Sequence, residues 1–548
     1  MKLKNIVILF VILALGTFFR LYNVNWDANF HLHPDERFLT MIGLKETLPA
    51  HVLDYLNPAA SPLSPSFLGF GFFVYGVLPL TINTLLALLL HTQLYDQYTL
   101  QGRILSGIFD VFTIYVVYLM ALLLQKKFHL PEKTKYFSAF FYALSVLPIQ
   151  LSHFFTVDIF LSFFVSVSIC SLLYCVFYKK LWMATLSGVG LGLAIACKIN
   201  ALAVIPLEIF LLFIPFFKER KIQKELPLFL IVFLLSCYIS VRFADPYLFA
   251  SRNVFDIHIS PSFLQSIHNL TSYANPQSLY PPNIQWINKL PVVFSLFNIA
   301  FFGIGLGLFA YLVWGIVFLI KTKRLILISL VAWVILFFLY QSTQYVKTMR
   351  YFIFLYPFFA LFAGVGFAAF LKKKPYILFI LVSILWIVVW PISFLSIYTK
   401  PHTRVTASIW INNTIPMGST ILGEYWDDPL PLSNDKGFTI DLLHVFDQES
   451  KEKWQIMQQQ LTAGDYLVLS SNRGWGSIME SKNLYPKTSA WYRDLFNGKL
   501  SYKKVSVFTS FPSLSYLGIP ITFSDTIAEE AFTVYDHPVV YVFKNESR

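Results

Sequence analysis

The apolar residues of this chain come in long runs, not in the short alternating patterns of soluble helices and strands. Most runs approach the ~20 residues that an α-helix needs to cross a bilayer. The first run is short, but no small-residue cleavage site follows Arg20, which favours an uncleaved helix over a signal peptide. The pattern predicts membrane helices at 5–19, 104–124, 136–156, 158–178, 182–197, 200–217, 226–243, 292–320, 325–342, 350–371 and 376–397.

The segment 67–90 is also apolar, but it contains Gly69, Gly71, Gly76 and Pro79. Cytoplasmic connections of membrane proteins carry an excess of Lys and Arg, so charge decides whether this segment crosses. If it lies along the membrane surface, eleven spans remain and all basic connections fall on the side of the N-terminus. These residues are Lys2, Lys4, Lys126, Lys127, Lys133, Lys135, Lys179, Lys180, Lys218, Arg220, Lys221, Lys224, Lys321, Lys323, Arg324, Lys372, Lys373 and Lys374. We therefore expect eleven spans, the N-terminus in the cytoplasm and the C-terminus outside.

The composition changes near Ile397. Residues 398–548 are polar and contain turn signals such as Pro416-Met417-Gly418. Short β-type runs such as 466–469 alternate there with helical patterns such as 451–461. The sequence thus predicts a transmembrane domain over 1–397 and a soluble extracytoplasmic α/β domain over 398–548.

The composition supports this division. The chain is 56% hydrophobic, 18% aromatic and only 13% charged, whereas soluble domains have about 25% charged residues. These values fit a polytopic α-helical protein of the cell membrane and exclude a disordered chain or a coiled coil. The net charge of +12 is explained by the basic connections, so no nucleic-acid partner is expected. The four cysteines lie in apolar runs without metal-ligand or disulfide spacing: Cys170, Cys175, Cys197 and Cys237.

With this topology, unusual polar residues gather at the outer face. His33, Asp35, Glu36 and Arg37 follow the first span, and Asp158 begins the fourth. A carboxylate there could act as a general base for a hydroxyl, and cations suit a phosphate. Charged residues beside spans often mark only the water interface, and Asp158 could be a helix N-cap. Further candidates on this face are Arg103, His153, Lys198, Arg242, Tyr247, Arg350 and Tyr351.

Two ionisable residues lie deeper in apolar runs, Asp110 and Glu208. An ionisable group inside the membrane is costly and is by default a candidate for a functional site. We favour polar links between helices for these two.

Several motifs resemble, in order, the bacterial polyprenyl-phosphate-dependent glycosyltransferases of the GT-C fold, family 39 type. These are similar to protein O-mannosyltransferases and to the aminoarabinose transferase that modifies lipid A. The motifs are His33-Pro34-Asp35-Glu36, 102–106, 150–158, 192–198, 242–247, 349–351 and 532–538. The resemblance implies transfer of a sugar from a polyprenyl-phosphate donor to an acceptor hydroxyl at the extracytoplasmic face, usually with inversion. It also implies that 67–90 is a helix on the membrane surface.

The resemblance assigns roles to individual residues. Asp35 matches the base for the acceptor, with Glu36 as its neighbour, and Asp158 matches a second acid. Lys198 and Arg350 match cations near the lipid phosphate. A Mg²⁺ or Mn²⁺ ion held by Asp35, Glu36 or His33 could assist. The remaining candidates would bind substrate: His33, Arg37, Arg103, His153, Arg242, Tyr247 and Tyr351.

The acceptor class stays open between a glycan, a lipid and a protein. Asp35 and Glu36 are adjacent and followed by Arg37, unlike in the eukaryotic mannosyltransferases, and 398–548 does not resemble their lumenal sugar-binding domain. Residues 426–428 and 473–475 could contact a sugar, or could equally be turn and core residues.

Two other function classes compete with glycosyl transfer. A transporter or lipid flippase predicts broken helices, ionisable residues near mid-membrane and two repeated halves, but the sequence shows no repeat. A non-catalytic membrane scaffold that presents 398–548 is the third hypothesis. In that case Asp35→Asn would leave a cell-envelope phenotype unchanged.

Overall fold

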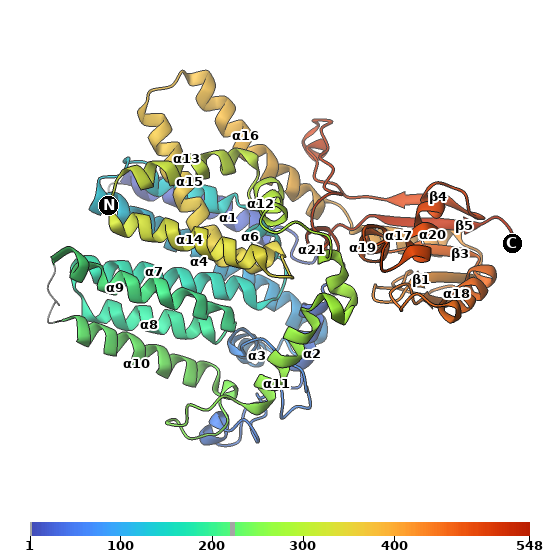
Figure 1. The fold of residues 1–548 in the computed structure, drawn as a ribbon, viewed down its shortest axis with the longest axis horizontal. Helices are drawn as coiled ribbons and strands as arrows, with labels where there is room; N and C mark the ends of the chain where they lie inside the picture. Colours follow the sequence, from blue (N-terminus) through green and yellow to red (C-terminus); the bar gives the residue numbers. More distant parts are fainter. Residues whose placement is uncertain (1–2, 220–224) are drawn as a thin grey trace.

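A computed structural model describes residues 3–219 and 225–548. It consists of a helical body and a smaller C-terminal domain with a sheet (Figure 1). The helices of the body are α1 (Leu3–Leu21), α2 (Pro34–Gly43), α3 (Leu78–Leu90), α4 (Tyr95–Phe128), α5 (Thr134–Ala143), α6 (Val146–Ser152), α7 (Val157–Tyr178), α8 (Leu181–Ile195), α9 (Ile205–Glu219), α10 (Leu226–Ala244), α11 (Pro261–Tyr273), α12 (Val293–Asn298), α13 (Leu306–Lys321), α14 (Leu325–Thr343), α15 (Tyr356–Lys372) and α16 (Ile377–Leu395).

Within the described residues, 6 helices are long and apolar enough to cross a membrane, or 7 if one bent pair counts as a span. Shorter apolar helices lie at Asn5–Leu21, Leu78–Leu90, Leu181–Ile195 and Ile199–Ile214. The chain is therefore a multi-pass membrane protein, and the count of eleven spans with its orientation stays a prediction. The segment 67–90 is helical only over the 13 residues of α3, fewer than a span needs.

Two predicted spans are interrupted. The run 136–156 is divided into α5 and α6, because Pro148 in the first turn of α6 would clash with the carbonyl of Leu144 if the helix were continuous. The run 292–320 bends by 118° between Val293–Gly303 and Leu306–Lys321. Gly305 lies at this bend with a φ of +82°, a backbone conformation that favours glycine.

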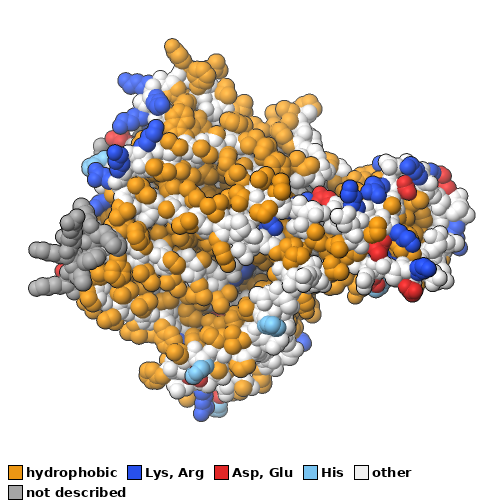
Figure 2. All heavy atoms as spheres, in the orientation of Figure 1, with side chains coloured by type: hydrophobic (Ala, Val, Ile, Leu, Met, Phe, Trp, Pro, Cys, Tyr) orange, Lys and Arg blue, Asp and Glu red, His pale blue; other side chains and the backbone are white. Residues whose placement is uncertain are grey.

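The basic residues gather at one end of the body. Figure 2 shows Lys and Arg side chains at the end of the helical body away from the C-terminal domain. The exposed basic residues of these connections are Lys126, Lys127, Lys133, Lys179, Lys180, Lys321, Lys323, Arg324, Lys372, Lys373 and Lys374. The predicted members Lys2, Lys4, Lys218, Arg220, Lys221 and Lys224 lie outside the residues whose side chains are described.

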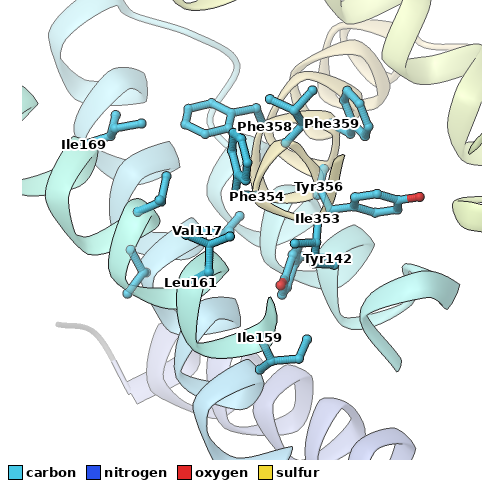
Figure 3. Packing of buried hydrophobic residues seen from close by; sticks show 14 of the residues in the cluster. Val117, Tyr142, Ile159, Leu161, Ile169, Ile353, Phe354, Tyr356, Phe358 and Phe359 are labelled. Carbon is cyan, nitrogen blue, oxygen red and sulfur yellow. The ribbon is translucent and has the colours of Figure 1, made fainter. Parts of the chain in front are cut away.

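The core of the body forms around α15. An 18-residue window of the span Met349–Lys372 is 100% buried inside the protein, and aromatic residues of this span lie in one cluster with side chains of α4, α5 and α7 (Figure 3). Glycines let α13 and α15 approach closely. A Cβ on Gly315 would lie 1.8 Å from the carbonyl oxygen of Phe362, so only glycine fits there, as is common between membrane helices.

Both deep ionisable residues link helices, as expected. Asp110 on α4 accepts hydrogen bonds from Arg20 Nε of α1 and Tyr142 of α5, each at 2.5 Å. Glu208 on α9 accepts one from Ser168 of α7 at 2.5 Å. All four cysteines are free thiols.

The C-terminal domain contains the sheet that the sequence predicts. Its elements are α17 (Thr403–Thr414), β1 (Thr420–Glu424), β2 (Thr439–Leu443), α18 (Lys451–Ala463), β3 (Tyr466–Leu469), α19 (Arg473–Glu480), α20 (Pro486–Phe496), β4 (Tyr502–Phe508), α21 (Glu530–Thr533) and β5 (Val540–Asn545). The strand order is β2-β1-β3-β5-β4, with β1 parallel to β2 and β3, and β5 antiparallel to β3 and β4. Alternate residues such as Tyr466 and Leu467 enter separate cores on the two faces.

The segment between β4 and β5 returns to the helical body. Gln150 of α6 donates hydrogen bonds to Asp536 and to the carbonyl oxygen of Phe532. Glu529 accepts from the hydroxyl of Thr348 at 2.7 Å and from the backbone N–H of Met349. Phe532 lies in the core of the body, so this segment is part of the wall at the end of the body that faces the C-terminal domain.

Candidate active site

The start of α2 sets the directions of the two adjacent acids. His33 is the N-cap, and its Nδ1 accepts from the backbone N–H of Glu36 at 3.4 Å. Pro34 occupies the first helical position, where its missing N–H costs nothing. Asp35 and Glu36 then point to different sides of the helix. The Asp35 side chain is 27% exposed, whereas the Glu36 side chain is fully buried.

Arg350 joins the two predicted acids. Its Nε donates to Asp158 Oδ2 at 2.6 Å, and its Nη1 donates to Asp35 Oδ2. Lys198 donates to the other oxygen, Asp158 Oδ1, at 2.9 Å. The four side chains come from α2, the first turn of α7, the chain after α8, and the 3-10 helix Met349–Leu355. Hence segments that are far apart in sequence form one charged cluster at the helix ends near the C-terminal domain.

Some hydrogen-bonding capacity in this cluster is left unused. Among the described residues, Asp35 Oδ1 and Arg350 Nη2 have no hydrogen-bond partner. The side chain of Arg350 is 17% exposed, and Lys198 lies over the ring of Tyr351 at 4.9 Å. The cluster therefore keeps one acceptor atom and one donor group available to a substrate.

The groups around Asp35 keep it ionised. Burial is the largest single influence and would raise the pKa of Asp35, but the charge and hydrogen bond of Arg350, with smaller effects of His33 and Lys198, together hold this pKa well below its ordinary value. Burial lowers the pKa of His33 to about 3, so its imidazole is neutral. Burial raises the pKa of Tyr75 well above its ordinary value, and the negative charges of Asp35 and Asp158 raise it further.

Glu36 belongs to a separate buried group. Its two oxygens accept from Arg103 at 2.5 and 2.8 Å, and one also accepts from the backbone N–H of Phe155. Arg103 also donates to both oxygens of Asp27, at 2.7 and 3.1 Å, and lies over the ring of Trp26 at 4.8 Å. Arg103, Glu36 and Asp27 are fully buried, so they hold the first loop against α4 and do not face the open cluster.

Among the described residues, Asp27, His31 and Glu36 form a group of possible metal ligands whose ligand atoms lie within 4.8 Å of one another. Arg103 already supplies positive charge between the two carboxylates, and His31 Nε2 contacts Asp96 at 2.7 Å, whereas His31 Nδ1 is buried without a hydrogen-bond partner among the described residues. In the predicted set, Glu36 is fully bonded and His33 Nδ1 faces a backbone N–H. The group of Asp27, His31 and Glu36 thus keeps one unpaired ligand atom, and a divalent cation held by Asp35, Glu36 or His33 stays a prediction.

Three predicted substrate-binding residues bind the protein itself. His153 is buried, contacts the carbonyl oxygens of Ile149 and Tyr22, and stacks on Tyr398 at 3.9 Å. Arg242 donates hydrogen bonds to the carbonyl oxygens of Pro246, Ser251 and Asn253 in the loop after α10. Its guanidinium also lies over the ring of Phe249. Tyr247 lies 2.7 Å from the hydroxyl of Ser61. In the structure, these three side chains thus hold neighbouring loops and helices in place.

The C-terminal domain contributes Tyr535 and Glu530, which were not among the predicted site residues, and Arg473 of the predicted segment 473–475. The centroid of the Tyr535 ring lies 4.3 Å from that of His33, and the guanidinium of Arg473 lies over the same Tyr535 ring, 5.9 Å from its centroid. Arg473 also donates to Glu530 at 2.8 Å. Tyr535 lies in the motif 532–538, so the family resemblance was the sequence feature that could have indicated it. No local pattern pointed to Glu530.

The residues at 426–428 and 473–475 have mixed surroundings. Asp427 and Asp428 accept from Arg404 at 2.6 and 2.8 Å, and Asp428 also accepts from Arg37. Trp475 packs against Phe496 and Tyr541 in the domain core. Trp426 is partly exposed and lies edge-on to Tyr280 at 5.6 Å.

Comparisons with known proteins show which families and structures this chain is similar to. Residues 79–242 match the family model described as dolichyl-phosphate-mannose-protein mannosyltransferase. The oligosaccharyltransferase of Archaeoglobus fulgidus, tethered with an acceptor peptide containing the NVT sequon, superposes with a TM-score of 0.58 at 11% identity, over 100% of this chain and 89% of that one. The chain has a GT-C-like fold. The resemblance drawn from the sequence is thereby confirmed for the fold and, over 79–242, by the family model.

Two further structures are similar to this GT-C-like chain. The archaeal oligosaccharyltransferase AglB from A. fulgidus, in complex with an inhibitory peptide and a dolichol-phosphate, has a TM-score of 0.54 at 10% identity, over 92% of this chain and 73% of that one. ArnT from Cupriavidus metallidurans bound to undecaprenyl phosphate has a TM-score of 0.43 at 12% identity, over 99% and 98%. A search among curated protein sequences finds no match.

Proposed function

We propose that this chain is an integral-membrane glycosyltransferase that moves a sugar from a polyprenyl-phosphate donor to an acceptor hydroxyl. The observation that carries the proposal is that Arg350 bridges Asp35 and Asp158 in one partly exposed cluster within a GT-C-like fold. The family model over 79–242 supports the donor class, because its description names a dolichyl-phosphate sugar. That matched region includes Asp158 and Lys198.

Asp35 is proposed as the general base. It is ionised, partly exposed, and has a carboxylate oxygen without a partner among the described residues. A carboxylate in this state can accept the proton of the acceptor hydroxyl as that oxygen attacks the anomeric carbon. The sugar–phosphate bond breaks as the new bond forms, and attack from the face opposite the phosphate would invert the anomeric centre.

Arg350 and Lys198 are proposed to bind the donor phosphate. Negative charge grows on the phosphate as the sugar leaves, and fixed cations stabilise that charge. Arg350 Nη2 is free among the described contacts, and Asp158 holds both cations side by side. Asp158 is thus a positioning residue in this proposal. No step requires a metal ion.

The face of the reaction is proposed to be extracytoplasmic. The cluster lies at the helix ends opposite the exposed lysines and arginines, which favour the cytoplasm. The C-terminal domain lies on the same side as the cluster and contacts it through Arg37 and Tyr535. We propose that 398–548 helps to recognise the acceptor, whether this is a glycan, a lipid or a protein.

A transfer assay tests the proposal. Purified protein in lipid is given a panel of radiolabelled polyprenyl-phosphate sugars, with a membrane extract as acceptor source. We expect release of polyprenyl phosphate by the wild type and by Asp96→Asn, a control at a largely exposed acid that pairs with His31. Asp35→Asn should lower the rate by at least about 100-fold. Absence of turnover with every donor would refute the enzyme and direct the next assay to lipid translocation.

A further inference from the structure

A hollow lies at the basic end of the helical body, far from the charged cluster. It has a volume of about 770 Å³ and opens between the turn that joins α4 to α5 and the end of α15. Part of its lining is apolar: Leu130, Pro131, Ala368 and Leu371. The other part is polar: Gln125, Lys126, His129, Glu132, Lys133 and Lys372. The hollow therefore offers both apolar surface and ammonium groups at the ends of membrane helices.

The three lysines of this lining have no visible protein partner. Among the described residues, Lys126, Lys133 and Lys372 form no ion pair, side-chain hydrogen bond or ring contact, and all three are exposed. Each comes from a different place: the last turn of α4, the residue before α5, and the last turn of α15. Three like charges around one hollow repel one another, and Glu132 is the single acid of the lining.

Their neighbours in sequence behave differently. Lys127 lies over Phe177 at 5.3 Å, Lys135 over Tyr136 at 5.0 Å, and Lys373 over Trp314 at 4.8 Å. Such cation–π contacts are an ordinary use of an interfacial lysine. A preference for positive charge on the cytoplasmic side explains all six lysines, but it does not explain why the three without a contact converge on one hollow.

We propose that this hollow binds the head group of an anionic glycerophospholipid. The lipid phosphate would accept hydrogen bonds from Lys126, Lys133 and Lys372, while the glycerol and upper acyl chain would lie on Leu130 and Leu371. Basic pockets between membrane helices bind lipid head groups in this way. The N-terminus of α5 begins at Thr134, beside the lining, and adds partial positive charge. This inference does not depend on the glycosyltransferase proposal.

The test uses the full chain in detergent and native mass spectrometry. Phosphatidylglycerol, phosphatidylcholine with the same acyl chains, and inorganic phosphate are each titrated. The lining variant carries Lys126→Gln, Lys133→Gln and Lys372→Gln. The matched control carries Lys127→Gln, Lys135→Gln and Lys373→Gln and has the same net charge. We expect the lining variant to lose about tenfold or more in affinity for phosphatidylglycerol, and the control to stay within about twofold of wild type.

Three results would overturn the inference. Equal loss in both variants would mean that only the overall charge attracts the lipid. Equal binding of phosphatidylcholine would mean that the head-group charge is not recognised. Full competition by inorganic phosphate would identify a free-anion site instead. Thermal unfolding checks that both variants fold, and the single changes Lys126→Gln and Lys127→Gln repeat the comparison if either triple variant does not.

Discussion

Arg37, two residues after the proposed base Asp35, donates a hydrogen bond at 2.8 Å to Asp428 of the C-terminal domain. Asp428 is itself held by Arg404 of α17 at 2.8 Å. The first loop and the C-terminal domain are thus joined directly beside the charged cluster. A movement of the domain would be transmitted to the start of α2.

This contact predicts a defect in transfer without a defect in folding. Arg37→Gln removes the bond between the domains but leaves the Asp428–Arg404 pair intact. Because the pair is partly exposed, we expect the free energy of unfolding to change by less than about 1 kcal/mol. Steady-state kinetics should show a severalfold fall in kcat/KM, restored in part by Arg37→Lys. Unchanged kinetics in Arg37→Gln would show that the contact has no role in transfer.

The buried group of Arg103, Glu36 and Asp27 predicts the opposite pattern, a defect in folding. Glu36→Gln leaves Arg103 with reduced charge compensation in a fully buried position, where breaking a pair costs about 3–5 kcal/mol. We expect a clearly lower midpoint of thermal unfolding. Asp35→Asn, one residue away, should lower it much less, since Asp35 and Arg350 are partly exposed whereas Glu36 and Arg103 are fully buried. Equal thermal midpoints for the two variants would contradict the separation of structural and catalytic acids.

Asp158 is expected to serve both stability and donor binding. Asp158→Asn removes the charge that holds Lys198 and Arg350 together, and we expect it to raise the KM for the polyprenyl-phosphate sugar and to lower the unfolding midpoint. Asp158→Glu keeps the charge and should recover most of the stability. A variant Asp158→Asn with wild-type KM would argue against a role for these cations at the donor phosphate.

His33 predicts a dependence of stability on pH. Its pKa in the folded protein is about 3, below the ordinary value of 6.5, so the unfolded chain binds more protons between these values. The contribution of His33 to stability therefore falls as pH decreases below about 6.5, by about 2 kcal/mol at pH 5. His33→Asn keeps an N-cap residue and removes this loss. Thermal unfolding of both proteins at pH 7.5 and 5 measures the difference.

The same groups predict the pH dependence of catalysis. Asp35 stays ionised because its pKa is depressed, and His33 stays neutral down to about pH 3. Neither residue should produce an inflection of kcat/KM between pH 5 and 7. An acid limb near 6.5 that disappears in His33→Asn would assign a proton-transfer role to His33 instead.

The orientation can be measured with single introduced cysteines. Met417→Cys lies on the exposed surface of the C-terminal domain, and Lys373→Cys lies at the basic end of the body. A membrane-impermeant maleimide should label Met417→Cys in intact cells and Lys373→Cys only after permeabilisation. The wild type with its four native thiols gives the background. The reverse labelling pattern would invert the proposed topology.

Hydropathy and charge predict much of this fold because each membrane helix must satisfy its own backbone and basic residues select one side. They also place Asp35, Asp158, Lys198 and Arg350 on the same face. They cannot show that Arg350 contacts Asp158 across 192 residues, since that contact depends on helix packing. Nor can they distinguish Asp35 from Glu36, because the difference comes from the N-cap at His33 and the position of Arg103.

The breaks in the predicted spans were harder to predict. A proline such as Pro148 is tolerated in the first turn of a helix and disruptive within one, so its effect depends on where the helix begins. The role of Tyr535 depends on the return of the last segment to the helical body, which no local pattern encodes.

That returning segment has a consequence for biosynthesis. Phe532 and Tyr535 contribute to the core and to the wall beside His33, yet they are synthesised after all the helices of the body, α1 to α16. While the chain is being made, the earlier helices can insert, but the cluster at Asp35 lacks one side. The charged cluster therefore gains its last side only after residues 532–535 have been made, and a chain that terminates before them reaches the membrane with an unfinished site.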